Sequence, residues 1–309
     1  MKNDALSQIE RLDILDESQG LPSFCALIVN PASGSYKKEK VAAAVAVLES
    51  SGVNVKLFMT TSAQDTESCS RQICALHERP LIIVGGGDGT INGVINGLSS
   101  QATLALLPLG TSNVLAAELK ITSIDDAVAR IVRRETRPLS VGLLDNGAQR
   151  RHFFLMAGIG ADGSVVEKVG ARKKKFLGKG AYLLSALQHF LSWEREKLAI
   201  SIAGIEKECH SIIICNAAHY GGAFRFAQGA DISSPFFEVI CIMSDRRRAY
   251  LKLAVNVLTG KSIFEEETVR FTGQRCMVSG RKAIQIDGDF FGYSPVTLTM
   301  VTEFARVIV

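Results

Sequence analysis

The first 135 residues alternate between short apolar runs and longer segments with helical patterning, and this alternation constrains the fold more than any other feature. The apolar runs predict strands over residues 24–30, 53–58, 81–84 and 103–107. Helical patterning lies between and after them, over residues 38–51, 62–79, 91–98, 112–119 and 123–134. Strands that alternate with helices form a parallel sheet covered by helices. The N-terminal part is therefore predicted to be a doubly wound α/β domain.

The last of these helices carries start and stop signals of its own. Ser123, with Asp126 three residues later, forms a capping box at its start. Arg130, Arg133 and Arg134 lie in its last turn, where positive charge complements the helix dipole. These signals fix the expected ends of the helix more firmly than apolar spacing alone does.

The patterning changes after residue 136. A turn at Asp145-Asn146-Gly147 joins two β-type runs and predicts a hairpin, with strands at 139–144 and 152–156. Further strands are predicted over 197–203, 207–216, 236–243, 266–272, 275–279, 283–287, 295–301 and 304–309, and helices near 162–193 and 246–258. Hairpins and polar turns in this number predict an antiparallel domain that resembles a β-sandwich.

Length and patterning together predict two domains. The chain has 309 residues, and an average domain has about 150. We expect an N-terminal extension over residues 1–21, the α/β domain over 22–136 and the β-rich domain over 137–299.

Composition excludes several classes of protein. Hydrophobic residues make up 47% and charged residues 21%, which argues against disorder, and a net charge of +4 is too small to indicate a nucleic-acid partner. No apolar run approaches the roughly 18 residues needed to cross a bilayer. The seven cysteines form no CxxC motif, and the N-terminal residues resemble neither a signal nor a transit peptide. These features predict reduced, mostly buried thiols and a cytoplasmic protein.

The stretch "LIIVGGGDGTING" places glycines and one carboxylate directly after a buried-looking strand. Ligands of open α/β sheets bind where strands end, and glycine amides at a helix N-terminus suit a polyphosphate. Asp88 would repel phosphates unless a cation lies between them, so it predicts Mg²⁺ held through water. The alternative is a tight strand–helix turn without a ligand, although three consecutive glycines cost backbone entropy.

Two more strands end in loops of the same kind. Asn30 opens the loop at residues 30–34, and Thr111 lies in the loop at residues 108–113. Each loop alone is as typical of turn formation as of a binding site. Because the carboxyl ends of parallel strands lie at one edge of a sheet, the three loops are expected to converge there.

Five stretches, "VNPASG", "GGGDGTINGVINGL", "PLGTSNVLAAEL", "AGIGADGSVVEKV" and "QIDGD", resemble the diacylglycerol kinase catalytic-domain family in content and order. That family includes bacterial soluble lipid kinases and the sphingosine and ceramide kinases. "GGDGT" also occurs in NAD kinases, whereas its combination with "PLGTSN" and "GIGADG" is more specific to lipid kinases. The resemblance implies a nucleotide-binding domain, completed by about residues 300–309, a lipid-substrate domain, and an active site in the cleft.

The resemblance also assigns roles to individual residues. The residues that it implies contact ATP are Asn30, Pro31, Ser33, Gly34, Thr60, Gly86, Gly87, Asp88, Gly89, Thr90, Asn92 and Thr111. The last acid of a family "DGE" triplet accepts the proton, and here the triplet ends in Asp289. Aspartate is one methylene shorter than glutamate, so either Asp289 or Asp287 is the candidate base. The local alternative for this triplet is a hairpin turn, because Asp-Gly favours one.

A second departure from the family lies in "FAQGADISSPFFEV". The family holds a structural Mg²⁺ there, and the aligned positions are Asp231, Ser234 and Phe236. Serine is a poor magnesium ligand compared with a carboxylate, which argues against this second metal site.

The function implied is the ATP- and Mg²⁺-dependent transfer of the γ-phosphate to a hydroxyl of diacylglycerol or a related lipid. One alternative is an enzyme that resembles NAD kinase, against which the "PLGTSN" loop counts. The other is a catalytically silent nucleotide or lipid sensor, which the departures at Asp289 and Ser234 favour.

A lipid substrate implies a protein that is peripheral at the inner membrane surface. The basic stretch 171–179 leads into an amphipathic segment that ends at Trp193, and basic residues favour anionic leaflets. The alternative is a solvated charge run followed by a core helix. Arg246–Arg248 form a second cluster, whose alternative is the charged start of a helix. Exposed strands of the second half could support a homodimer.

Overall fold

The computed structural model describes residues 24–168, 195–220, 224–225, 227–259 and 267–309. The chain forms two compact units. Unit 1 runs to Leu139 and includes Glu303–Val309, and unit 2 consists of Ser140–Thr302.

Unit 1 is built on a parallel sheet. Its strands are β1 (Cys25–Val29), β2 (Val55–Met59), β3 (Leu81–Gly86) and β4 (Thr103–Pro108). They pair in the order β2-β1-β3-β4, all in parallel, and every residue of β1 and β3 is buried. The end of β18 (Val296–Ile308) pairs in parallel with β4 through Arg306 and Val307. The predicted parallel sheet is confirmed.

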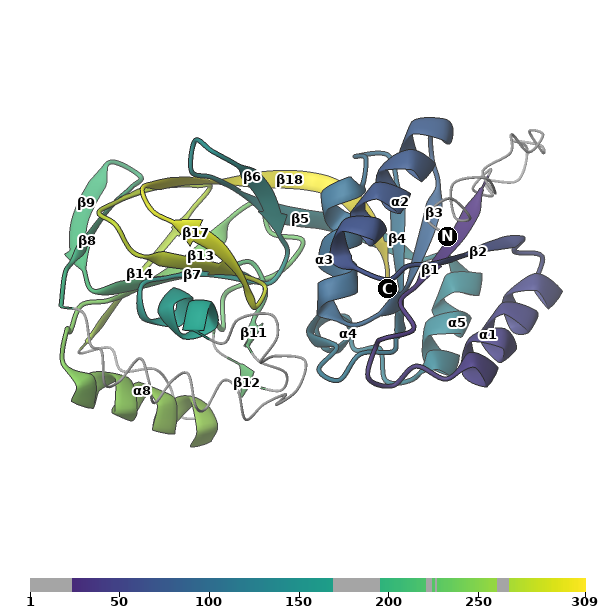
Figure 1. Cartoon of the computed structure of the whole chain (residues 1–309), viewed down its shortest axis with the longest axis horizontal. Coiled ribbons are helices and arrows are strands. Elements are labelled where there is room, and N and C mark those ends of the chain that lie inside the picture. Colours follow the sequence, from purple (N-terminus) through teal and green to yellow (C-terminus); the bar gives the residue numbers. More distant parts are fainter. Residues whose placement is uncertain (1–23, 169–194, 221–223, 226, 260–266) are drawn as a thin grey trace. The chain divides into compact units, whose positions relative to one another are not determined.

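Helices cover both faces of this sheet, as the alternation predicted. They are α1 (Lys38–Ser50), α2 (Ala63–Leu76), α3 (Asp88–Gly97), α4 (Val114–Glu118) and α5 (Ile124–Arg133). Figure 1 shows α2 with α3 on one side of the strands and α1 with α5 on the other. The predicted cap is also confirmed, because the Ser123 hydroxyl accepts a hydrogen bond from the Asp126 amide at 3.1 Å.

Two helices differ from their predicted bounds near the glycine loops. α3 begins at Asp88, three residues before the first apolar position of its stripe. α4 begins only at Val114, because Asn113 adopts a left-handed conformation with a φ of 49°. The spacing of apolar residues identifies the face of a helix that packs on the sheet. It therefore does not identify a first turn that contains only glycine and polar residues.

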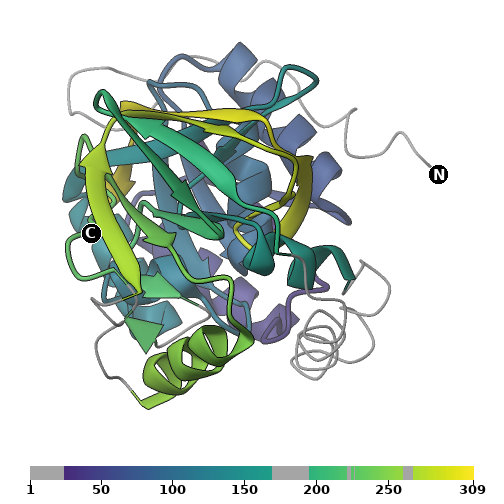
Figure 2. The same ribbon diagram turned by 90° about the vertical axis from the view of Figure 1, so that its left-hand side faces the viewer.

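Unit 2 contains two antiparallel layers (Figure 2). One layer has the strand order β14 (Thr268–Gly273), β13 (Phe237–Ile242), β10 (Ser211–Cys215), β7 (Met156–Ile159), β16 (Ala283–Ile286) and β17 (Asp289–Tyr293). The other contains β9 (Ile205–Cys209), β8 (Leu198–Ile202), β15 (Arg275–Ser279), the first part of β18, β5 (Thr136–Asp145) and β6 (Arg150–Phe153). A short ribbon of β11 (His219–Tyr220) and β12 (Phe224–Arg225), a helix over 161–168, and α8 (Arg247–Thr259) accompany them.

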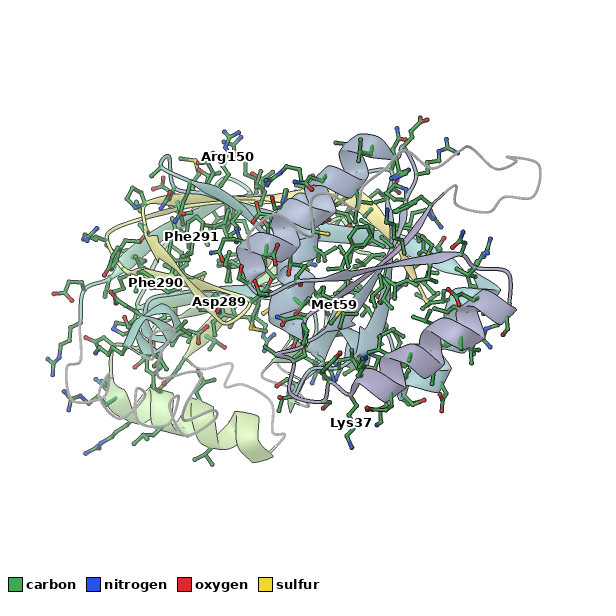
Figure 3. All side chains as sticks on the ribbon, turned by 45° about the vertical axis from the view of Figure 1, so that its right-hand side comes forward. Lys37, Met59, Arg150, Asp289, Phe290 and Phe291 are labelled. Atoms are coloured by element: carbon green, nitrogen blue, oxygen red, sulfur yellow. The ribbon has the colours of Figure 1, made fainter. Side chains whose placement is uncertain are left out.

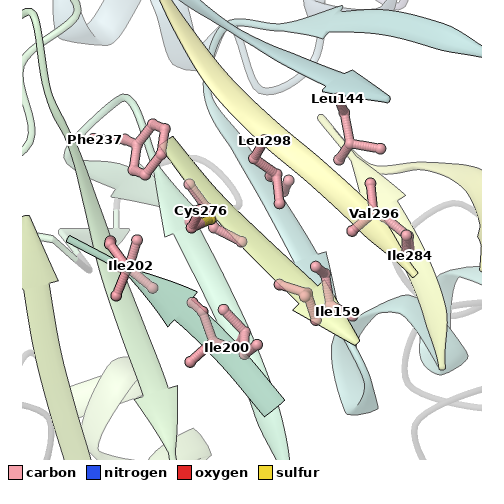
Figure 4. Packing of buried hydrophobic residues seen from close by; sticks show 14 of the residues in the cluster. Leu144, Ile159, Ile200, Ile202, Phe237, Cys276, Ile284, Val296 and Leu298 are labelled. Atoms are coloured by element: carbon pink, nitrogen blue, oxygen red, sulfur yellow. The ribbon is translucent and has the colours of Figure 1, made fainter. Parts of the chain in front are cut away.

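The core of unit 2 lies between these layers (Figure 4). Ile200, Ile202 and Cys276 from one layer pack against Ile159 and Phe237 from the other, and all are nearly or fully buried. Two antiparallel sheets that enclose one apolar core form a sandwich, so the predicted character of this half is confirmed.

Several strands of unit 2 differ from the prediction. The single strand predicted over 207–216 is two strands, β9 and β10, because the chain changes sheets at His210. The two strands predicted over 295–309 are one strand, β18, which continues through Glu303 despite a φ of 49°. β17 was not predicted. The helix expected near 162–193 is present over 161–168, and the rest of it lies outside the described residues.

All seven cysteines are free thiols, and five of them are buried, in agreement with the sequence. Among the described helices, none combines the length and the hydrophobicity that crossing a bilayer requires.

Candidate functional site

Three loops of unit 1 meet where β1, β3 and β4 end. They are residues 30–35, 86–90 and 109–113, referred to below as the first, second and third loops. The Asn30 amide donates to the Gly85 carbonyl at 3.1 Å, and the Ser35 amide donates to the Leu109 carbonyl at 2.9 Å. The Ser35 hydroxyl also donates to the Gly110 carbonyl. The predicted convergence of the loops is therefore present in the fold.

Some of the glycines serve the packing of these loops on each other. A Cβ added to Gly110 would lie 2.3 Å from the Gly87 Cα, and one added to Gly34 would lie 2.4 Å from the Thr111 hydroxyl oxygen. A Cβ is not tolerated this close to backbone, so Gly110 must be glycine for the second and third loops to touch, whereas a Cβ at Gly34 would require the Thr111 side chain to move. Because loop packing explains these glycines, they are not evidence for a bound ligand.

Gly89 is different from the other glycines of the second loop. An added Cβ would have no heavy atom within 4 Å, and its φ is not in the left-handed region. Glycine inside a helix is less stable than alanine by roughly 0.5–1 kcal/mol, and nothing in the protein at this position requires it. Its missing side chain leaves open space at the N-terminus of α3, where backbone amides favour an anion.

Asp88 stands beside this open space at the first position of α3. Its Oδ1 accepts hydrogen bonds from the Val114 amide at 2.9 Å and the Leu115 amide at 3.4 Å. Burial raises the pKa of Asp88 above its ordinary value, and the bonds from these two amides counteract part of that rise. The carboxylate is therefore held in a fixed orientation in a place where its negative charge is poorly solvated.

Asn113 orients the two amides that bind Asp88, and sequence reasoning gave it no role. Its side-chain oxygen accepts from the Gly110 amide at 2.8 Å, and its side-chain nitrogen donates to the Gly110 carbonyl at 2.9 Å. These bonds close the third loop immediately before α4 begins. The available signal was the residue type, because asparagine tolerates the left-handed conformation better than most residues do.

The other candidates of unit 1 fall into two groups. Pro31, Gly34, Gly89 and Thr111 are exposed, and Asn30, Ser33 and Gly87 are partly exposed. Gly86, Thr60, Thr90 and Asn92 are buried. The Thr60 hydroxyl is occupied inside the unit, since it lies 3.4 Å from the Val29 carbonyl and accepts from the Thr66 hydroxyl at 3.0 Å. The buried residues of this second group lie inside the unit and support the conformation of the loops.

A hollow of about 1170 Å³ lies beside these loops, between α1 and α5. Its lining includes Ser35, Ser112 and Asn113, together with alanine and valine side chains such as Ala44 and Val128. No residue of the second loop lines it. Its charged lining residues are Lys40, Asp125 and Arg133.

In unit 2, Asp287 and Gly288 form the two-residue turn between β16 and β17. Both have positive φ values, 48° and 86°, as a type I′ hairpin turn requires. The Asp287 carboxylate accepts from three backbone amides: Phe154 at 3.0 Å, Leu155 at 2.9 Å and Met156 at 3.0 Å. Asp287 thus ties its hairpin to the segment that leads into β7.

Asp289 has a different environment. It is the first residue of β17 and is exposed, and Phe290 and Phe291 follow it along the strand (Figure 3). Of the two acidic residues in the triplet, Asp289 is exposed, whereas Asp287 is partly buried and its carboxylate is bound to three amides.

A polar chain supports this hairpin from beneath. The Gly288 amide donates to the Gln285 side-chain oxygen at 2.8 Å, and the Gln285 side-chain nitrogen donates to Asp162 at 2.7 Å. A Cβ on Gly158 would lie 2.1 Å from the Asp162 carboxylate, so glycine there makes room for it. Sequence reasoning singled out the motif containing Asp162 without assigning this contact.

The positions aligned with the second metal site form a local turn. One Asp231 carboxylate oxygen accepts from the Ser233 amide at 2.7 Å, and the Ser234 hydroxyl accepts from the Phe236 amide at 3.0 Å. The described residues contain no group of three or more His, Cys, Asp or Glu side chains placed to hold a metal ion.

Comparisons with known proteins agree with this architecture. Residues 25–144 match the family described as diacylglycerol kinase catalytic domain, and residues 156–309 match the YegS C-terminal NAD kinase beta sandwich-like domain. The chain is 27% identical over 279 residues to a diacylglycerol kinase of Bacillus subtilis, covering 87% of this chain and 90% of that one. It is 22% identical over 291 residues to a diacylglycerol kinase of Staphylococcus carnosus, covering 91% and 93%.

A solved structure supports the fold. A crystal structure of a diacylglycerol kinase from Bacillus anthracis matches with a TM-score of 0.68 and 19% identity, covering 92% of this chain and 96% of that one. Identity at this level shows a shared fold and leaves the substrate open.

Proposed function

Because the chain belongs to the lipid kinase family that joins a diacylglycerol kinase catalytic domain to a YegS-type C-terminal domain, we propose that it is an ATP-dependent lipid kinase. The proposed reaction transfers the γ-phosphate of ATP to a hydroxyl of diacylglycerol or a related lipid. The protein would act as a peripheral protein at the inner membrane surface, where such a lipid is found.

The observation that carries this proposal is the pairing of Asp88 with the open space over Gly89. A carboxylate whose pKa is raised by burial is stabilised in its charged form by a cation, and amides at the start of α3 favour an anion beside it. A nucleotide polyphosphate with Mg²⁺ supplies both charges. The residues present therefore fit this pair of ligands.

Each residue has a defined part in the proposed reaction. The amides of the second loop and of the α3 N-terminus bind phosphate oxygens, and Asp88 would hold Mg²⁺ through water. When bound, Mg²⁺ neutralises charge on the phosphate oxygens. Asn113 keeps the Val114 and Leu115 amides in place, and these amides fix the Asp88 carboxylate.

In unit 2, we assign proton acceptance from the lipid hydroxyl to Asp289. Its exposed carboxylate can approach a hydroxyl, and transfer requires the two oxygens to come within about 2.6–3.2 Å. Asp287 instead anchors the hairpin that carries Asp289, because its oxygens accept three amide hydrogen bonds.

The second candidate is a catalytically silent protein that binds nucleotide or lipid. One observation favours it: aspartate at position 289 is shorter than the glutamate that lipid kinases of this family use. A base that cannot reach the hydroxyl would leave binding intact and remove transfer.

The test is incubation of the protein with labelled ATP, Mg²⁺ and mixed lipids, followed by thin-layer chromatography of the chloroform-soluble products. A labelled lipid that depends on the protein supports the kinase, and a screen of single lipids then identifies the substrate. The Asp88→Asn variant serves as a control that should give no product. Binding of ATP by the wild type without a labelled lipid from any fraction would favour the silent binder.

A further inference from the structure

α8 lies on the outside of unit 2 (Figure 2), and two of its apolar side chains are exposed. Leu251 is 54% exposed and Val255 is 56% exposed. They are four residues apart and lie one above the other on the same helical face. Arg248 and Lys252 complete a run at i, i+3, i+4 and i+7, so this exposed stripe combines apolar and basic residues.

The orientation of α8 is fixed from its inner side. The Tyr250 hydroxyl donates to the Ser211 hydroxyl at 2.7 Å and lies 2.6 Å from the His210 ring nitrogen. Ala249 and Asn256, seven residues apart, are buried on that same inner side. The helix is therefore pinned to unit 2, and Leu251 and Val255 point outward as a stable feature of the fold.

A hollow of about 520 Å³ lies at the start of α8. Its lining is Arg195, Asp245, Arg246, Arg247 and Arg248. The four arginines are exposed, and together with the one aspartate they give the hollow a positive charge. Guanidinium groups bind phosphate oxygens in a two-pronged geometry, so the lining suits an anion of that class.

We propose that α8 docks unit 2 onto an anionic lipid bilayer. The arginine-lined hollow receives the phosphate of a headgroup, and Leu251 and Val255 enter the boundary of the acyl chains. Arg248, Leu251, Lys252 and Val255 lie on one face of the helix, so basic and apolar groups would meet the same surface together. A bilayer surface offers phosphates and acyl chains together, whereas a free phosphate has no apolar part for Leu251 and Val255 to contact.

This docking surface deepens the proposed function, because it would bring the protein to the membrane that holds its lipid substrate. It differs from the basic stretch 171–179, which lies outside the described residues. A basic amphipathic helix that lies in the plane of the interface binds through apolar contact and through attraction to anionic lipid together. Both parts must therefore contribute to binding here.

The test is co-sedimentation with sucrose-loaded vesicles of phosphatidylglycerol, with vesicles of phosphatidylcholine as the uncharged reference. The first variant combines Arg246→Gln, Arg247→Gln and Arg248→Gln. The second combines Leu251→Gln and Val255→Gln. A matched control combines Arg150→Gln and Ile205→Gln in the same unit, where the arginine side chain is 73% and the isoleucine 50% exposed.

The wild type is expected to bind only the anionic vesicles. The triple arginine variant should bind them about 100-fold more weakly, given about 1 kcal/mol for each basic residue near an anionic surface. The second variant should lose about tenfold or more, and the control should match the wild type. All of the changed residues are exposed, so unfolding curves should coincide with that of the wild type.

Three results would overturn the docking surface: no vesicle binding by the wild type, equal binding by all variants, or dependence on the arginines without dependence on Leu251 and Val255. The last of these, with competition by inorganic phosphate, would indicate a simple anion site. Kinase activity on lipid dispersed in neutral detergent micelles separates the two proposals. Vesicle binding without any activity in micelles would refute the kinase and leave the docking surface standing.

Discussion

Replacing Asp287 with asparagine distinguishes an anchor from a proton acceptor. Asp287 Oδ1 accepts from the Leu155 and Met156 amides, and Oδ2 accepts from the Phe154 amide. Asparagine keeps one oxygen, so two bonds survive without their charge, which weakens each by about 1 kcal/mol. The third amide then faces an NH₂ group and loses its acceptor, at a cost of about 1–3 kcal/mol. The expected loss of stability is about 3–5 kcal/mol.

The assay is urea unfolding followed by far-UV circular dichroism, with Asp289→Asn as the matched control. Asp289 is exposed, so its replacement should change stability by less than about 0.5 kcal/mol. The same replacement should lower lipid phosphorylation by about 10²–10⁴-fold, as loss of a general base does. An Asp287→Asn protein that is fully stable yet inactive, beside an active Asp289→Asn protein, would refute the assignment and name Asp287 as the acceptor.

Two further predictions concern residues of α3. Gly97→Ala should destabilise the protein by about 1–3 kcal/mol in urea unfolding, because its Cβ would lie 2.2 Å from the Glu67 carbonyl oxygen. Gly89→Ala should leave stability unchanged or raise it, because no heavy atom lies within 4 Å of a Cβ at that position. Burial raises the pKa of Asp88 in the folded protein above its value of about 4 in the unfolded chain. As the pH rises, the unfolded chain therefore loses this proton first. The free energy of unfolding then falls between about pH 4 and the pKa of Asp88 in the folded protein. Asp88→Asn should therefore be more stable than the metal-free wild type at pH 7 and lose this advantage near pH 4; an unchanged difference at both pH values would contradict the role of burial.

The fold of unit 1 was predictable because its signals are local. Each strand of the parallel sheet is a short apolar run, and the cap at Ser123 is set by residues within one helical turn. Unit 2 was harder because its strands pair at long range. A continuous β-type pattern over 207–216 does not reveal that the chain changes sheets at His210. Propensity likewise gave no sign that β18 passes unbroken through Glu303.

The candidate site shows the same division between local and distant causes. The second loop and Asp88 were found from the sequence, because glycines and an acid after a buried strand are unusual in any context. The sequence did not separate Gly89, which faces open space, from Gly87 and Gly110, which pack on each other. The contacts of Asp287 with residues 154–156 were also hidden, because they join segments more than 130 residues apart.

The most direct test of the whole account is calorimetric titration of ADP, with and without Mg²⁺, into the wild type and into Asp88→Asn. The variant keeps an oxygen that can accept from the Val114 and Leu115 amides, so its fold should remain intact. Wild-type affinity for ADP should rise with Mg²⁺, and the variant should lose this Mg²⁺-dependent part although its thermal unfolding temperature is no lower than that of the metal-free wild type. Equal Mg²⁺-dependent binding by both proteins would contradict the claim that nucleotide and cation meet at this carboxylate.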